Sequence, residues 1–121
     1  MCEIKSFRDL RVWQRGLDLA EAVYESTGSF PPSERFGLQS QMRRSAVSVP
    51  SNIAEGWGRE SRAEYIRFLV IARASLFELM TQIELAQRVG LGTGMDSAKS
   101  LANEIGRMLS GLLKALRNPN P

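Results

Sequence analysis

Apolar residues recur every three or four positions along four stretches of this chain, which is the spacing of one face of an α-helix. Residues that favour turns separate the four stretches at positions 26–33, 56–60 and 90–96. The pattern therefore predicts four helices, over residues 7–26, 33–56, 62–89 and 96–117, and no strand. Four amphipathic helices joined by short loops predict an all-α fold, an up-and-down four-helix bundle.

Each predicted helix carries an apolar stripe that we expect to face the core. In the first helix two stripes lie side by side, a main one of larger side chains (Leu10, Trp13, Leu17, Ala20, Tyr24) and a second one (Val12, Gly16, Leu19, Val23). The stripes of the other helices are Leu38, Met42, Ser45, Val49 and Ile53; then Tyr65, Phe68, Leu69, Ala72, Leu76, Leu79, Ile83 and Ala86; then Ala98, Leu101, Ile105, Met108, Leu112 and Ala115.

Pro50 lies inside the second predicted helix. Proline lacks a backbone N–H, and its ring crowds the carbonyl four residues earlier, so we expect a kink here, or a break followed by a short piece ending at Gly56. The amide of Asn52 is expected to satisfy the carbonyl that the proline frees. The hydroxyls of Ser45 and Ser48 are expected to bond back to the preceding turn. Gly56 suits a left-handed turn at the end of the helix.

The third predicted helix has more apolar surface than a single core needs. Ser61 and Glu64 have the spacing of a capping box at its start, and Gly90 is expected to end it. Beside the main stripe runs a second one, which consists of Ile66, Val70, Ala74 and Phe77. Exposed apolar patches usually mark an interface, so we predict that this stripe is an oligomer interface; a wide contact within the core is the alternative.

Length and composition are those of an ordinary globular protein. The chain has 121 residues, of which 43% are hydrophobic and 24% charged, and this length fits one domain spanning residues 1–121. Residues 1–6 and 118–121 are expected to be disordered tails. Neither a run of 18 apolar residues nor an apolar signal core is present, so we expect a cytoplasmic protein without membrane contact.

Candidate chemistry is sparse. The sequence contains one cysteine, Cys2, and no histidine, which removes the commonest general base and the commonest metal ligand. No phosphate-binding loop or nucleophile motif occurs. The three glutamates near the second turn are better explained by capping and pairing with Arg59 and Arg62 than by acid–base catalysis. We therefore predict no catalytic residue, no metal, no cofactor and no enzymatic activity.

Positive charge gathers in the middle of the chain. The net charge is +3, but residues 35–73 hold seven arginines against three glutamates. Arginine suits phosphate because its planar guanidinium donates two parallel hydrogen bonds. The candidate nucleic-acid-binding residues are Arg43, Arg44, Arg59, Arg62, Arg67 and Arg73. Without a recognition motif, such binding would follow the RNA or DNA backbone and not its sequence. Solvated helix faces are the alternative explanation of the same arginines.

Three segments resemble one bacterial family. RRSAVSVPSNIAEGWGR, at residues 43–59, is similar to a signature of the type RRAAVSIPANIAEGFGR. Residues 7–24 and 61–91 resemble the first and third helices of the same family, which includes proteins encoded by intervening sequences inside 23S ribosomal RNA genes. The motif residues taken from the signature are Pro50, Asn52, Glu55 and Gly56. The chain departs from the pattern at Ser51, Ala74 and Met80, where alanine, glycine and glutamate are common.

The resemblance implies a four-helix bundle that assembles into a ring of five copies. A related branch, the accessory protein of diversity-generating retroelements, associates with a reverse transcriptase and binds nucleic acid through a basic surface. Two hypotheses therefore follow for function. The first is an oligomeric, non-catalytic factor that binds RNA or DNA. The second is an oligomeric scaffold that binds a protein partner and has no role with nucleic acid.

Overall fold

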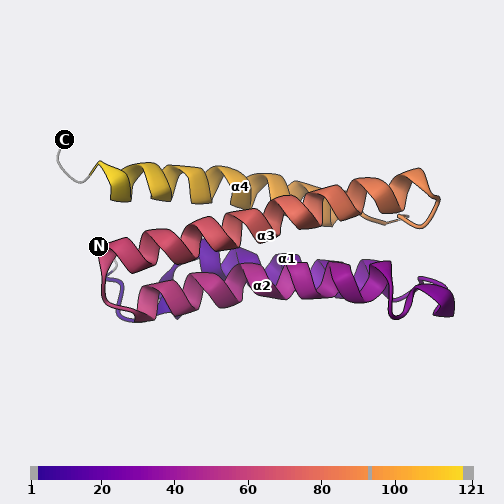
Figure 1. Cartoon of the computed structure of the whole chain (residues 1–121), viewed down its shortest axis with the longest axis horizontal. Coiled ribbons are helices and arrows are strands. Elements are labelled where there is room, and N and C mark those ends of the chain that lie inside the picture. The colour runs from indigo at the N-terminus through magenta and orange to yellow at the C-terminus, as the bar shows by residue number, and fades with distance from the viewer. Residues whose placement is uncertain (1–2, 93, 119–121) are drawn as a thin grey trace.

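The chain folds into four long helices and two single turns of 3-10 helix (Figure 1). The structure is a computed structural model that describes residues 3–92 and 94–118. In order, the elements are η1 (Phe7–Asp9), α1 (Arg11–Thr27), η2 (Pro32–Glu34), α2 (Leu38–Gly58), α3 (Arg62–Arg88) and α4 (Asp96–Arg117). No strand occurs in this part of the chain. The predicted four-helix bundle is confirmed.

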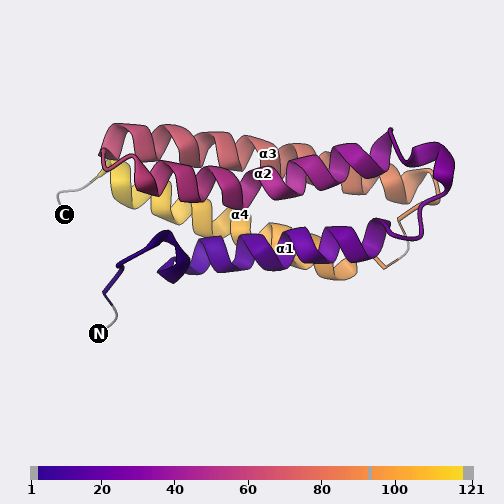
Figure 2. The same cartoon turned by 90° about the horizontal axis from the view of Figure 1, so that it is seen from below.

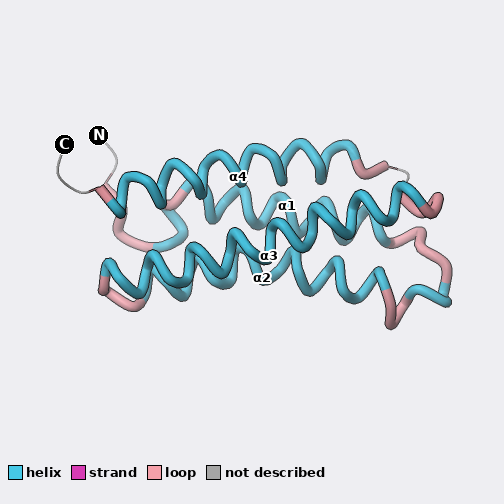
Figure 3. The backbone as a smooth tube through the Cα atoms, turned by 45° about the horizontal axis from the view of Figure 1, so that its top comes forward, coloured by secondary structure: helices cyan, strands magenta, loops and turns pink. Residues whose placement is uncertain are grey.

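Consecutive helices run in opposite directions. The α1–α2 and α3–α4 loops lie at one end of the bundle and the short α2–α3 loop lies at the other (Figure 3). Helix α1 packs against α2 and α4, and helix α3 packs against the same two helices (Figure 2). Among the described residues, α1 and α3 are not neighbours, and neither are α2 and α4. The α1–α2 side and the α3–α4 side are therefore opposite sides of the bundle.

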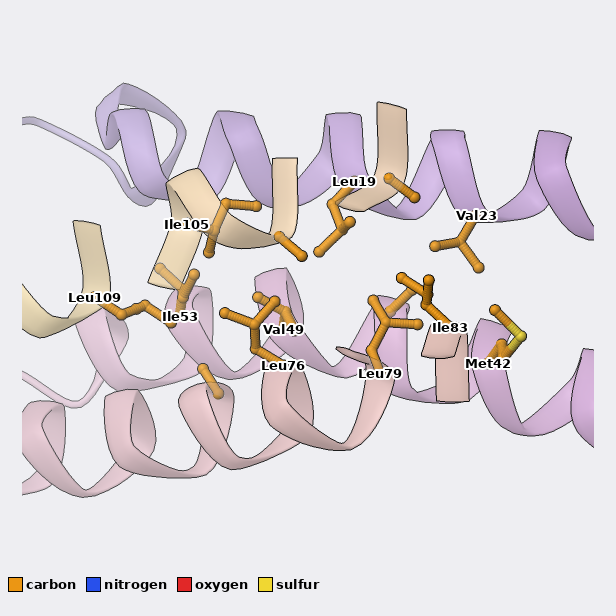
Figure 4. Packing of buried hydrophobic residues seen from close by; sticks show 14 of the residues in the cluster. Leu19, Val23, Met42, Val49, Ile53, Leu76, Leu79, Ile83, Ile105 and Leu109 are labelled. Carbon is orange, nitrogen blue, oxygen red and sulfur yellow. The ribbon is translucent and has the colours of Figure 1, made fainter. Parts of the chain in front are cut away.

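All four helices contribute to one hydrophobic core. In Figure 4, Leu19 of α1, Val49 of α2, Leu76 of α3 and Ile105 of α4 point into the space that the helices enclose. These four side chains have no solvent exposure. Full burial of such a side chain contributes roughly 1.5–3 kcal/mol, so the core is the main source of stability.

Capping groups at the helix ends follow the sequence signals in part. The hydroxyl of Ser61 accepts a hydrogen bond from the backbone N–H of Glu64 (3.3 Å), which is one half of the predicted capping box. Gly90 follows α3 with a φ of 81°, as expected for a glycine that ends a helix. The start of α2 was predicted four or five residues too early. Its first turn is capped from outside by Glu34, whose carboxylate accepts from the backbone N–H of Leu38 (3.0 Å).

The predicted core stripe is correct for α3 but wrong for α1. The buried residues of α1 are the smaller second stripe, with Thr27 added to it: Val12, Gly16, Leu19, Val23 and Thr27. Leu17 and Tyr24, predicted to be core, are 45% and 47% exposed. A Cβ atom on Gly16 would lie 3.1 Å from the Cβ of Pro50 in α2. The small stripe faces inward because α1 packs this closely on α2.

The core stripe of α4 is displaced in the same way. Its buried residues are Ala98, Ala102, Ile105, Leu109 and Leu113. Of the predicted positions, Leu101, Met108 and Leu112 are only half-buried, and Ala115 is exposed. Ala98 and Ile105 belong to both sets, so the true face is rotated by about one residue from the predicted one.

Helix α2 continues through Pro50, so of the two predicted alternatives, a kink or a break, the break does not occur. The amide of Asn52 donates to the carbonyl of Ser48 (2.8 Å), and not to the carbonyl of Ala46, which is the one that the proline frees. The predicted back-bonding of the serines is also replaced. The hydroxyl of Ser48 pairs with the hydroxyl of Ser75 in α3 (2.8 Å). The hydroxyl of Ser45 donates to the carboxylate of Glu78, also in α3 (2.8 Å).

Candidate functional site

An apolar groove follows the outer side of the α3–α4 pair. Phe77 and Met80 of α3 face Gly106 and Ser110 of α4 across a hollow of about 470 Å³. A smaller hollow lined by Met80 and Lys99 continues it toward the α3–α4 loop. The α4 wall combines the small residues Gly106 and Ser110 with the longer side chains of Asn103 and Arg107. We call this surface the α3–α4 groove.

The four residues of the predicted interface stripe meet different environments. Ile66 and Val70 are half-buried and pack against the core. Ala74 is exposed, and Phe77 leaves 54% of its surface in contact with solvent. Part of the stripe is therefore a wide core contact. The remainder, centred on Phe77, is apolar surface that the folded chain leaves uncovered.

Positive charge flanks this groove. Arg107 lines it from α4, and Arg73 lies on α3 four residues before Phe77. Neither arginine forms an ion pair with another described residue. Glu84 is the acidic residue at the Lys99 end of the groove. Cations that border an apolar groove favour a partner that is itself apolar and acidic.

A second apolar surface lies on the α1–α2 side, and sequence reasoning missed it. Arg43 of α2 stacks on the ring of Tyr24 of α1, with 4.5 Å between the guanidinium carbon and the ring centroid. This contact shows that the face of α1 that carries Tyr24 borders the face of α2 that carries Arg43. Helical spacing adds further apolar residues to those faces: Trp13, Leu17 and Ala20 on α1, and Val47 and Ala54 on α2.

The centre of this α1–α2 face is uncovered. Leu17 and Val47 are 45% and 42% exposed, while Trp13, Ala20 and Ala54 are half-buried. The signal was present in the sequence as the larger of the two stripes on the first helix. Both stripes of this helix have the helical period, and the period alone does not show which of them faces the core.

Three of the six candidate nucleic-acid-binding arginines are held by contacts within the chain. Arg43 donates to the hydroxyl of Thr27 (2.9 Å) and to the carbonyl of Tyr24 (3.2 Å), so it caps the end of α1. Arg59 and Arg67 lie near the ring of Phe68, at 4.9 and 4.6 Å from its centroid. These guanidinium groups contribute to packing, and their geometry is set by their partners.

The arginines beside Phe68 also have carboxylate partners. Arg59 pairs with Glu55 (2.9 Å), and Arg67 pairs with Glu64 (3.0 Å). The hydrogen bond from Arg67 holds the pKa of Glu64 below its ordinary value, and the same bond raises the pKa of Arg67. Charge at the α2–α3 turn is therefore largely balanced. The predicted pairing of Glu55 with Arg59 is confirmed.

The other three candidates, Arg44, Arg62 and Arg73, form no ion pair within the described residues. They lie on different parts of the bundle. Arg44 borders a polar hollow between α2 and α3, Arg62 is the first residue of α3, and Arg73 is eleven residues further along. One copy of the chain therefore does not bring the six arginines together on a single face.

The remaining motif residues act in packing. A Cβ atom on Gly56 would lie 2.6 Å from the Cβ of Phe68, which is closer than real Cβ contacts. Gly56 therefore lies at a close approach of α2 and α3. The left-handed residue of the α2–α3 turn is Glu60, with a φ of 56°, and not a glycine. The glycine turn predicted for the end of α2 is wrong.

Two buried polar atoms have no hydrogen-bond partner among the described residues, the hydroxyl of Tyr65 and the side-chain carbonyl of Gln82. Burial raises the pKa of the Tyr65 hydroxyl. Within residues 3–92 and 94–118, no three Cys, Asp or Glu side chains are grouped so that they could hold a metal ion. None of the helices in this part of the chain has the length and apolar character needed to cross a membrane.

Comparison with known proteins identifies the family. A model of the 23S rRNA-intervening sequence protein family matches residues 8–111, which is most of the chain. The chain belongs to this family. The match includes the motif at residues 43–59 and reaches all four helices, so the resemblance noted in the sequence is confirmed.

A solved structure shares the fold. A crystal structure of a protein of unknown function from the S23 ribosomal protein family of Bacteroides thetaiotaomicron superposes with a TM-score of 0.77. The two sequences are 26% identical, and the alignment covers 85% of this chain and 95% of the other. A search of curated proteins found no match.

Proposed function

We propose that the protein is a non-catalytic, self-assembling scaffold whose copies join through the α3–α4 groove. The observation that supports this most strongly is Phe77, a phenylalanine in the middle of a helix that leaves 54% of its surface uncovered. Burial of such a side chain against a partner contributes roughly 1.5–3 kcal/mol. The resemblance to ring-forming relatives favours five copies.

Substitution of Phe77 by aspartate tests the proposal. Assembly would bury a carboxylate without a partner, so Phe77→Asp is expected to reduce the mass seen in light scattering from several times 13.5 kDa to 13.5 kDa. Leu85→Asp is the matched control, because Leu85 is 50% exposed on the same helix but does not line the groove. A wild-type protein that is monomeric at micromolar concentration would rule out this function.

Binding of RNA or DNA is a second candidate function. It rests on Arg44, Arg62 and Arg73, the three of the six candidate arginines for which the described residues show neither an ion pair nor a side-chain hydrogen bond. Three cations per copy are too few for tight binding, but five copies on one assembly would act together. The contacts would be made to phosphate groups, so the affinity would depend on salt and not on sequence.

A titration of structured RNA and duplex DNA by fluorescence anisotropy tests this candidate. Affinity is expected to fall roughly a thousandfold between 50 and 200 mM salt if six or more phosphates are contacted. Combined replacement of Arg44, Arg62 and Arg73 by alanine should abolish binding. Replacement of the paired Arg59 and Arg67 should retain most of it. No binding by the wild type at about 50 mM salt would leave the scaffold alone as the proposed function.

A further inference from the structure

The bundle leaves two different apolar surfaces uncovered, and they lie on opposite sides. One is the α3–α4 groove around Phe77, and the other is the α1–α2 face around Leu17 and Val47. They are opposite because each helix packs only on its two neighbours, in the cyclic order α1, α2, α3, α4. No single flat partner could cover both surfaces of one copy at once.

The symmetry of an assembly decides how many of these surfaces it covers. A two-fold contact joins a surface to the same surface on a second copy, so it would cover either the groove or the α1–α2 face and leave the other exposed. A head-to-tail contact joins two different surfaces, and repetition of that contact covers both on every copy. Two unlike apolar surfaces on opposite sides therefore favour the head-to-tail arrangement.

The charges at one edge of each surface are complementary. Glu21 is exposed on α1, one turn from Leu17, and forms no ion pair with a described residue. At the other edge of the α1–α2 face, the exposed Arg44 lies one turn from Val47 and is unpaired among the described residues as well. Arg73 and Arg107 border the groove, and neither forms an ion pair with a described residue. The α1–α2 face also contains Arg43, but its guanidinium is already bonded to Thr27. Opposite charges at the edges of two apolar surfaces direct one toward the other.

From these observations we infer that the α3–α4 groove of one copy receives the α1–α2 face of a second copy. The inference rests on the proposed self-assembly and adds the identity of the two surfaces. Leu17 and Val47 of one copy would cover Phe77, Gly106 and Ser110 of the next. Glu21 of the first copy would lie near Arg107 of the second.

Mixing two defective variants tests this pairing directly. Leu17→Asp damages the α1–α2 face, and Phe77→Asp damages the groove. Each variant alone should be a monomer of 13.5 kDa, because every contact in a uniform sample would include the damaged surface. An equimolar mixture retains one intact groove and one intact face, so it should form a one-to-one dimer of twice that mass. Both side chains are about half exposed, and circular dichroism should show unchanged helical content.

A second experiment tests the charge pairing. Glu21→Arg and Arg107→Glu should each weaken assembly at low salt, and the double variant should restore it.

Other outcomes of these experiments would contradict the inference. If Leu17→Asp assembles as the wild type does, or if the mixture of two monomeric variants stays at 13.5 kDa, the pairing of surfaces is wrong although self-assembly can still hold. If the wild type itself is monomeric, both the pairing and the proposed scaffold fail.

Discussion

Gly56 should be the least replaceable of the glycines within the helices. It is buried in α2 at a close approach to α3, and an added Cβ atom would lie 2.6 Å from the Cβ of Phe68. The Cβ of Phe68 is fixed to the backbone of α3, so rotation of a side chain cannot relieve the overlap. The two helices would have to separate, and overpacking of this kind typically costs about 1–3 kcal/mol.

The change from glycine to alanine also has a favourable effect, which a control must remove. Alanine stabilises a helix interior by about 1 kcal/mol relative to glycine. Gly111 in α4 provides that control, because it is exposed and a Cβ atom added to it would have no described atom of another helix within 4 Å. We expect Gly111→Ala to raise the free energy of unfolding by about 1 kcal/mol. Gly56→Ala should then fall about 1–3 kcal/mol below Gly111→Ala.

Gly16→Ala is expected to have a stability between those of the other two variants. Its added Cβ would lie 3.1 Å from the Cβ of Pro50, a close contact that a small shift can relieve. The expected order of stability is therefore Gly111→Ala, then Gly16→Ala, then Gly56→Ala. Urea unfolding followed by circular dichroism would measure it, at one protein concentration because assembly makes stability depend on concentration. Equal stability of the Gly56 and Gly111 variants would show that α2 and α3 are not held at the distance described.

Two further predictions concern Arg43 and Pro50, which both lie in α2. Arg43→Ala should lower the free energy of unfolding by about 1–2 kcal/mol, since it removes the donor to buried Thr27, and urea unfolding beside Arg43→Lys would check this. Pro50→Ala should keep the helical circular dichroism signal, because α2 is already continuous there. The gain in helix propensity, about 3 kcal/mol, offsets most of the lost ring packing; a loss of more than about 2 kcal/mol would contradict this.

Helix positions could be predicted from the sequence because their signals are local. The cap at Ser61 and the glycine at position 90 mark the two ends of α3 without reference to the rest of the fold. Pro31 and Pro32 are followed by the single turn η2 and not by α2, so the start of α2 was placed too early. The bounds of α3 and α4 agree with prediction to within one residue. The core stripe of α3 was also predictable, since its apolar residues recur at helical spacing along the whole helix.

The buried face of α1 could not be predicted, because two stripes with the same period compete. Periodicity treats Leu17 and Leu19 as equal candidates, and side-chain size favours the wrong stripe. The deciding interaction is the contact between Gly16 and Pro50, which joins residues far apart in the sequence. The hydroxyl pair of Ser48 and Ser75 is of the same kind. Such contacts appear only when the helices are placed in three dimensions.

The candidate site was likewise predictable only in part. The uncovered part of α3 was predictable, because a second stripe on a long helix exceeds what one core can cover. The state of Arg43 was not, since its partners are a hydroxyl and a carbonyl of α1, which charge counting ignores. A sum of charges over residues 35–73 therefore overestimates the cations that are available to a nucleic acid.

The family motif and the uncovered surfaces serve different purposes. Pro50 and Gly56 are buried spacers that fix the distances of α2 from α1 and from α3. Leu17 and Phe77 lie outside this motif and leave about half of their surface in solvent. Changes at Leu17 or Phe77 therefore alter what the bundle can bind while the helices stay in place. Changes at Gly56 move the helices, and both apolar surfaces move with them. Assembly should thus be separable from folding at the surfaces but not within the motif.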